Sequence, residues 1–112
     1  MKRVYLGEFE EVVLLMVGIL GDNAYGVNLT HEINEQTGRE VRLNQVHASL
    51  HRLEEKGMIA SRMGDPTPER GGRRKRMFRI TAYGLQTLRE IQGVRSNLWN
   101  MFPSSSIKPT GA

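Results

Sequence analysis

The sequence predicts a small α+β domain, mainly α, in which three helices and a two-stranded hairpin form a body and a long fourth helix follows. Apolar residues recur at helical spacing along much of the chain. Two short apolar segments flank a loop rich in glycine and proline, as in a hairpin. The chain has 112 residues, of which 38% are hydrophobic and 25% charged, values typical of one globular domain.

Two helices are expected in the first third of the chain. Apolar residues at steps of three and four predict the first helix over about residues 7–20. A turn follows at residues 21–23. The second helix is predicted over about residues 25–37, with Gly38 after its last residue as the C-cap.

A third helix is expected near the middle of the chain. Residues 39–43 alternate polar and apolar side chains and predict a short strand before it. Asn44 then caps a helix over residues 45–56, and Gly57 ends it. Val46, Leu50 and Leu53 form its apolar stripe. The opposite face carries hydrogen-bonding side chains, so it is either merely solvated or available to bind a partner.

The second half begins with a hairpin. Strands are predicted over residues 58–63 and 75–80, joined by a loop at residues 64–74 that contains two prolines and three glycines. Loops of this length are uncommon in compact domains unless they have a function. The loop also begins the strongest charge cluster of the chain. Residues 70–79 hold six positive charges and no acid, in a chain whose net charge is +4, so the remainder has a net charge of −2.

The fourth helix is predicted to begin after a Thr81 cap and to end before Pro103. It is expected to be about 31 Å long and to project beyond the body. Ile91, Val94, Leu98 and Met101 recur at the spacing of a helix-pairing seam, and Trp99 and Phe102 widen it. With Phe9, Val13 and Met16 of the first helix, these residues predict a homodimer interface. The alternative is that the last helix folds back on its own protomer.

The order of these elements predicts a winged helix-turn-helix. In that fold the third helix enters the major groove of DNA, and the hairpin loop reaches along the phosphate backbone or into the minor groove. The basic cluster lies where the tip of the wing is expected and would attract a polyanion. The predicted DNA-binding residues are Tyr25, Asn44, Gln45, His47, Ser49, His51, Arg52, Arg70, Gly71, Gly72, Arg73, Arg74, Lys75 and Arg76. Packing under the third helix explains Tyr25 equally well, and a solvated charge run is the alternative for the wing.

The sequence resembles the PadR family of bacterial transcriptional regulators over roughly residues 6–90. The resemblance is carried by Leu6-Gly7-Glu8-Phe9-Glu10-Glu11, Ala24-Tyr25-Gly26-Val27, Val46-His47-Ala48-Ser49-Leu50-His51-Arg52-Leu53-Glu54-Glu55-Lys56-Gly57-Met58-Ile59, and Glu69-Arg70-Gly71-Gly72-Arg73-Arg74-Lys75-Arg76-Met77-Phe78-Arg79-Ile80-Thr81 with Gly84. Many members have tyrosine and proline in place of His47-Ala48. The resemblance implies the short branch of the family, with a single C-terminal helix, and a dimeric repressor that senses a small molecule or is regulated through its own abundance.

Other classes of function are disfavoured. The chain has no cysteine, which excludes disulfides and thiolate metal sites and fits the cytoplasm. The longest apolar run, residues 12–20, is too short to span a membrane. His47 and His51 have the spacing of a metal-binding pair, but Ala48 stands where a hydrolytic zinc motif needs glutamate. No enzyme activity, metal or cofactor is therefore expected.

The sequence thus predicts a winged-helix DNA-binding domain over residues 1–81, a dimerisation helix over residues 82–103 and a disordered tail over residues 104–112. The predicted function is a homodimeric, sequence-specific repressor that binds a near-palindromic operator on double-stranded DNA. The rival is a winged-helix module for protein interaction or small-molecule sensing in which DNA binding is secondary. Trp99, Met101 and Phe102 would line an interface pocket for a small aromatic effector, although ordinary packing explains them equally well.

Overall fold

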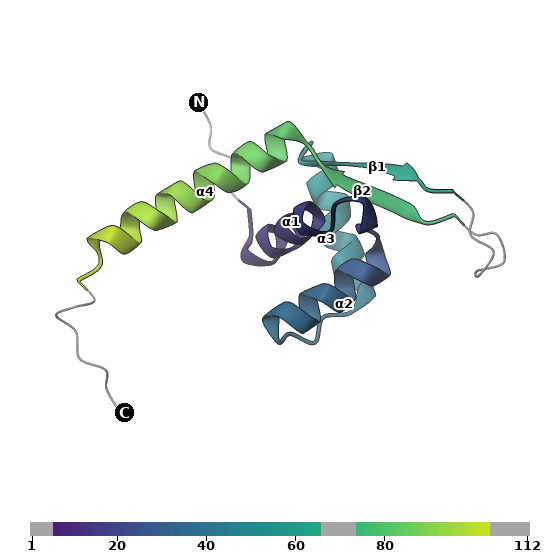
Figure 1. The fold of residues 1–112 in the computed structure, drawn as a ribbon, viewed down its shortest axis with the longest axis horizontal. Coiled ribbons are helices and arrows are strands. Elements are labelled where there is room, and N and C mark those ends of the chain that lie inside the picture. The colour runs from purple at the N-terminus through teal and green to yellow at the C-terminus, as the bar shows by residue number, and fades with distance from the viewer. Residues whose placement is uncertain (1–5, 66–73, 104–112) are drawn as a thin grey trace.

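The computed structural model describes residues 6–65 and 74–103 of the chain. Helices α1 (Glu8–Leu20), α2 (Gly26–Thr37) and α3 (Leu43–Glu55) form a compact body (Figure 1). A short 3-10 turn, η1 (Gly21–Asn23), joins the first two. Strands β1 (Ile59–Met63) and β2 (Arg76–Ile80) form a hairpin on one side of the body, and α4 (Ala82–Met101) extends from the other side (Figure 1). The predicted α+β winged helix-turn-helix fold with one helix after the wing is confirmed.

The core lies between the three helices of the body and the base of the hairpin. It contains Val13, Leu14, Met16, Val17, Ala24, Leu29, Ile33, Val46, Leu50, Leu53, Met58, Ile59 and Phe78, all buried. These apolar side chains lie on one stripe of each helix, so their burial fixes the helices relative to one another and drives their association. The stripe predicted for the third helix is confirmed in full.

The beginning of α3 differs from the sequence prediction. Asn44 was expected to cap the helix, but the N-cap is Arg42, whose backbone is extended. The reason is a reach-back contact in which the Arg42 N–H donates to Oε1 of Gln45 at 2.8 Å. The side chain of Asn44 is thereby left on the exposed first turn of the helix.

The strand predicted over residues 39–43 is wrong, because residues 39–42 have no regular structure and Leu43 already begins α3. The side chain of Asn34 accepts a hydrogen bond from the Val41 N–H at 2.8 Å and donates to the Val41 carbonyl at 3.1 Å. These bonds occupy the backbone groups with which Val41 would join a sheet.

The segment before α2, rather than residues 39–43, pairs with the hairpin. Tyr25 forms an isolated bridge with Met77, and the Phe78 N–H donates to the Ala24 carbonyl at 2.8 Å. The hairpin is antiparallel, with Ser61 opposite Phe78. Both strands lie within one residue of their predicted ranges. The start of α2 is therefore attached directly to the wing.

A hydrogen-bonded cap joins the hairpin to α4. Oγ1 of Thr81 accepts from the Gly84 N–H at 3.1 Å and donates to the Gly57 carbonyl at 2.8 Å. The predicted Thr81 cap is confirmed, as is the Gly38 cap of α2, which adopts φ 71°. Within residues 6–65 and 74–103, no helix is long and apolar enough to cross a membrane. The tail prediction for residues 104–112 lies outside the described residues.

Candidate nucleic-acid interface

The outward face of α3 is polar and exposed along its N-terminal half. Asn44, Gln45, His47 and His51 are all exposed, and Ala48 lies among them without obstructing access. Gln45 uses Oε1 for the helix cap, which leaves its amide nitrogen directed to no described partner. Amide and imidazole groups of this kind form hydrogen bonds to base edges in the major groove. The face is thus chemically suited to base contact.

His47 lies directly against the first residue of α2. A Cβ atom on Gly26 would come within 2.8 Å of Cε1 and 2.9 Å of Nε2 of His47. A larger residue at position 26 would displace the imidazole from this place, so Gly26 lets the His47 ring lie against the beginning of α2. The His47 ring is therefore positioned by the backbone of α2 while it remains exposed.

Tyr25 links this contact to the wing. Its half-buried ring lies beneath Lys75, with Nζ 4.2 Å from the ring centroid. A cation over an aromatic face is attracted by the electron density of the ring. A continuous path thus runs from β2 to the exposed beginning of α3, through Lys75, Tyr25, Gly26 and His47. Tyr25 thus packs against the wing rather than under the third helix, and its contact with phosphate stays a prediction.

The base of the wing presents cationic side chains. Arg74, Arg76 and Arg79 are exposed, and Lys75 is half-buried beside Tyr25. Arg76 donates to Oγ of Ser61 at 3.0 Å. The other predicted wing contacts, Arg70, Gly71, Gly72 and Arg73, lie outside the described residues. Arginine presents several N–H donors and retains its charge, which suits it to phosphate contact.

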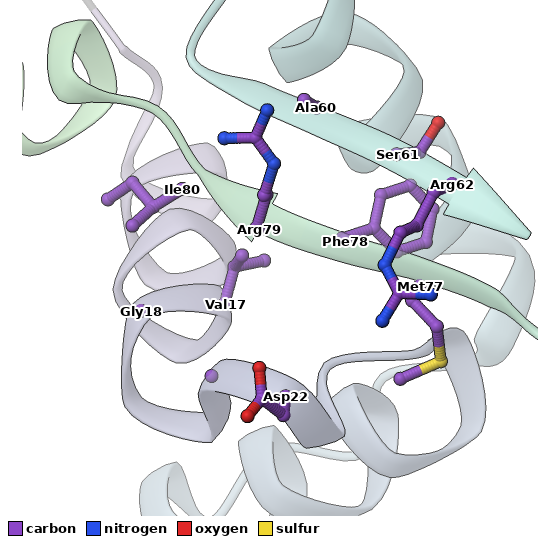
Figure 2. Close-up of a pocket in the computed structure, with 11 residues that line it drawn as sticks. Val17, Gly18, Asp22, Ala60, Ser61, Arg62, Met77, Phe78, Arg79 and Ile80 are labelled. Atoms are coloured by element: carbon purple, nitrogen blue, oxygen red, sulfur yellow. The ribbon is translucent and has the colours of Figure 1, made fainter. Parts of the chain in front are cut away.

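Arg79 and one further arginine border a hollow between the hairpin and the end of α1. The hollow has a volume of about 170 Å³, and its floor includes Val17 and Phe78 (Figure 2). Arg62 of β1 and Arg79 of β2 lie along its rim, and Asp22 lies across from them (Figure 2). The prediction included Arg79 in the basic cluster but not among the contact residues, and it missed Arg62. The period-two alternation of the strand that contains Arg62 is the signal that would place this side chain outward.

Two predicted DNA contacts on α3 have hydrogen-bond or ion-pair partners within the protein. Ser49 is completely buried and accepts a hydrogen bond from Arg52 at 3.1 Å, so its predicted contact with DNA is wrong. Arg52 also lies 3.4 Å from Oε2 of Glu10. Both residues lie on the side of α3 nearer α1, but only Ser49 is buried; the Arg52 side chain is 53% exposed, and its contact with DNA stays a prediction.

Glu10, which the sequence analysis did not single out, is a buried carboxylate at the centre of this contact. Its oxygens lie 3.0 and 3.1 Å from Nζ of Lys56 and accept a hydrogen bond from the Gly7 N–H at 3.2 Å. Burial alone would raise the pKa of Glu10. The hydrogen bonds from Lys56 and Gly7 and the positive charges of Lys56 and Arg52 outweigh burial and lower the pKa. The carboxylate is therefore held in its ionised form.

The predicted dimer surface is partly corrected. Val13 and Met16 are buried in the protomer core, so their assignment to an interface is wrong. Phe9 is half-buried, and Arg39 lies over its ring. The outer face of α1 instead exposes Leu15 and Ile19, at 44% and 71%. Val13 and Met16 point inward because they belong to the apolar stripe of α1 that fills the core.

The second half of α4 exposes a large apolar surface. Val94, Leu98, Trp99, Met101 and Phe102 are exposed, the last four by 51 to 78%, and Ile91 is half-buried. A groove of about 240 Å³ is lined by Arg95, Leu98, Trp99 and Phe102. The rings of Trp99 and Phe102 lie 5.5 Å apart at a tilt of 54°. In the described part of the chain nothing covers this stripe.

No group of three or more side chains able to hold a metal ion occurs in residues 6–65 and 74–103. The imidazole of His51 instead lies 2.5 Å from a carboxylate oxygen of Glu55 one turn later in α3.

An exposed polar helix joined to a cationic two-stranded wing defines the winged helix-turn-helix class of regulators. A family model described as the transcriptional regulator PadR-like family matches residues 15–90, and the chain belongs to this family. Its members are regulators of transcription rather than enzymes. No curated protein matches the chain.

Solved structures of the family are similar over most of the chain. A PadR-like transcriptional regulator from Bacillus cereus has 17% identity and a TM-score of 0.70, covering 90% of this chain and 93% of that one. A PadR family regulator from Eggerthella lenta has 26% identity and a TM-score of 0.65, covering 83% and 80%. Bacillus subtilis PadR, solved in complex with operator DNA, has 20% identity and a TM-score of 0.62, covering 76% of this chain and 46% of that one.

Proposed function

We propose that this PadR-family regulator is a homodimeric repressor that binds a specific, near-palindromic site on double-stranded DNA. The observation that carries the proposal is the continuous surface from the exposed face of α3, through the Gly26 and His47 contact, to Lys75 over Tyr25. A helix and a wing fixed to each other in this way can engage one groove and its adjacent phosphates together. The complex of Bacillus subtilis PadR with operator DNA supports this assignment.

Base contact is assigned to the outward polar face of α3. Asn44, Gln45, His47 and His51 are the predicted residues that are exposed on this face, whereas the exposed Arg52 is paired with Glu10. Arg74, Lys75 and Arg76 are assigned to phosphates, together with Arg70, Gly71, Gly72 and Arg73 of the loop, and we add Arg62 and Arg79. Because phosphate contacts carry no base information, variants of the two groups should change different properties of binding.

Dimerisation is assigned to α4. Its exposed stripe of Val94, Leu98, Trp99 and Met101 is larger than isolated surface apolar residues require, and such patches mark interaction sites. The exposed Leu15 and Ile19 of α1 supply a second apolar surface. A twofold dimer would place two α3 helices about 34 Å apart, one turn of DNA, on a near-palindromic operator. In this assignment residues 1–81 bind DNA, residues 82–103 hold the dimer together, and the protein acts in the cytoplasm.

The groove beside Trp99 is the proposed position for a small aromatic effector. Its lining of Leu98, Trp99 and Phe102 is apolar and aromatic, as a planar ligand requires. A ligand that binds one spacing of the two protomers more tightly would shift the population toward that spacing. The rival function, protein interaction or ligand sensing with DNA binding secondary, uses the same groove.

The test is selection of bound duplexes from genomic fragments of the source organism, followed by footprinting on the selected sequence. We expect a protected site with twofold symmetry that overlaps a promoter, and increased transcription when the gene is deleted. A failure to enrich any sequence, with a dimer still present in sedimentation, would favour the rival function.

A further inference from the structure

The first turn of α1 contacts the segment before α3, the end of α3 and α4. Glu8 pairs with Arg39, which lies in the segment before α3. Glu10 pairs with Arg52 and Lys56 at the end of α3. Glu11 pairs with Arg95 of α4 at 2.8 Å, between residues 84 positions apart in the sequence. Three carboxylates within four consecutive residues thus bind basic side chains of three different segments.

Two of these carboxylates, those of Glu10 and Glu11, are not ordinary surface charges. The side chains of Glu10 and Glu11 are only 10% and 16% exposed, so much of their hydration has been removed. Ion pairs of partly buried groups are screened less than exposed pairs and respond more strongly to loss of a partner. Because Glu10 and Glu11 are adjacent on one rigid helical turn, a displacement of one changes the position of the other.

Arg95 connects the exposed apolar groove of α4 with α1. It lines the groove with Leu98, Trp99 and Phe102 while its guanidinium holds Glu11. A change at that groove, whether in the packing of a second protomer or in bound material, therefore acts on the side chain that is attached to α1. No other described residue of α4 forms an ion pair with the body of the protein.

We propose that the first turn of α1 couples α4 to α3, with Arg95 and Glu11 as the link on one side and Glu10 with Arg52 and Lys56 on the other. In this assignment Glu10 and Glu11 are positioning residues, which contact no DNA. They set where α3 lies relative to the dimerisation helix, and so the match between the two α3 helices and the two half-sites. The coupling rests on the proposed function for its biological meaning, although its structural part can be measured without DNA.

The matched pair of variants is Arg95→Gln and Arg89→Gln. Both remove one positive charge from an exposed position of α4, but Arg89 has no ion-pair partner among the described residues. The first measurement is amide hydrogen exchange of α3 in the free protein. We expect Arg95→Gln to accelerate exchange near Arg52 and Lys56 about three- to tenfold, and Arg89→Gln to leave it unchanged.

The second measurement is affinity for a duplex selected from a random-sequence pool, compared with an unselected duplex. Arg95→Gln should reduce the affinity for the selected duplex about three- to tenfold more than Arg89→Gln does. The two variants should reduce the affinity for the unselected duplex to the same small extent. The exchanged pair Glu11→Arg with Arg95→Glu should recover most of the loss. Because the exchanged pair keeps both charges, it also tests the coupling if Arg95→Gln folds poorly.

Equal α3 exchange and equal selectivity in the two variants would overturn the proposal. If no duplex is selected by the wild-type protein, the proposed function fails, whereas the exchange result still decides the coupling. Faster exchange throughout the protein, rather than in α3, would also overturn it, because that result indicates general loss of stability.

Discussion

Gly84 is the position where the structure predicts the largest effect of adding a single methyl group. A Cβ atom on Gly84 would lie 2.2 Å from the Met58 carbonyl oxygen and 3.0 Å from Cγ1 of Ile80. The oxygen cannot easily withdraw, because it accepts a hydrogen bond from the Thr81 N–H at 3.0 Å. The Thr81 cap holds the first turn of α4 against the same segment. Gly84→Ala must therefore separate α4 from the body or distort its cap.

The magnitude follows from two opposing effects. Overpacking costs typically 1–3 kcal/mol, and the upper end, about 3 kcal/mol, applies because the contact is with backbone. Alanine is favoured over glycine inside a helix by about 1 kcal/mol. We expect Gly84→Ala to lower the free energy of unfolding by about 2 kcal/mol, or the melting temperature by about 8 °C.

Gly93→Ala is the matched control, because it makes the same substitution in the same helix. A Cβ atom there meets no atom within 4 Å, so only the gain in helix propensity remains, about 1 kcal/mol. The two variants should therefore differ by about 3 kcal/mol. Urea unfolding followed by circular dichroism at one fixed protein concentration measures both. Equal stability of Gly84→Ala and Gly93→Ala would refute the close contact at Met58.

Four further predictions follow from the site. Changing Arg73 and Arg74 together to alanine should weaken specific and random duplexes alike and flatten the salt dependence by about 0.9 per lost phosphate contact in a log–log titration. Leu98→Lys should convert the expected dimer to monomer in sedimentation and abolish operator binding. Glu10→Gln should destabilise the protein at neutral pH but not in acid. Because the pKa of the Glu10 carboxyl is lower in the folded protein than its ordinary value of 4.5, the ionised carboxylate stabilises the fold at pH values above 4.5, and this stability is lost as the pH falls through the folded pKa. Planar aromatic compounds should quench Trp99 saturably, and a panel without such quenching would remove the effector proposal.

The elements of the fold were largely predictable because they depend on local patterns. The apolar stripe of α3, the Gly38 and Thr81 caps and the two short strands that flank the loop are properties of neighbouring residues, and the structure confirms each. The strand predicted over residues 39–43 failed because Asn34 occupies the backbone groups of Val41. That contact joins residues seven positions apart, across a helix end, and periodicity does not report it.

The candidate site was predictable in its residue types but less so in their orientation. The helical pattern correctly placed His47 and His51 outward, yet it also assigned Ser49 to DNA, and Ser49 is buried. A helix that packs against two neighbours buries more than its apolar stripe, so small polar residues at the edge of the stripe become enclosed. On α1 the same effect explains why Val13 and Met16, which were predicted to lie in a dimer interface, are buried. The apolar stripe of α1 that contains them packs into the core of the protomer.

The arginines show why residue type alone does not determine function in this protein. Arg52 and Arg95 bind carboxylates of α1, whereas Arg74 has no acidic partner among the described residues. A buried carboxylate such as Glu10 requires cationic partners, since an unpaired charge would cost several kcal/mol. The fold supplies those partners where helices cross, and among the described residues no ion pair forms along the exposed edge of the hairpin. The described arginines of the wing therefore retain positive charge that a phosphate backbone could neutralise, and this difference in surroundings is the physical reason for proposing them, rather than Arg95, as phosphate contacts.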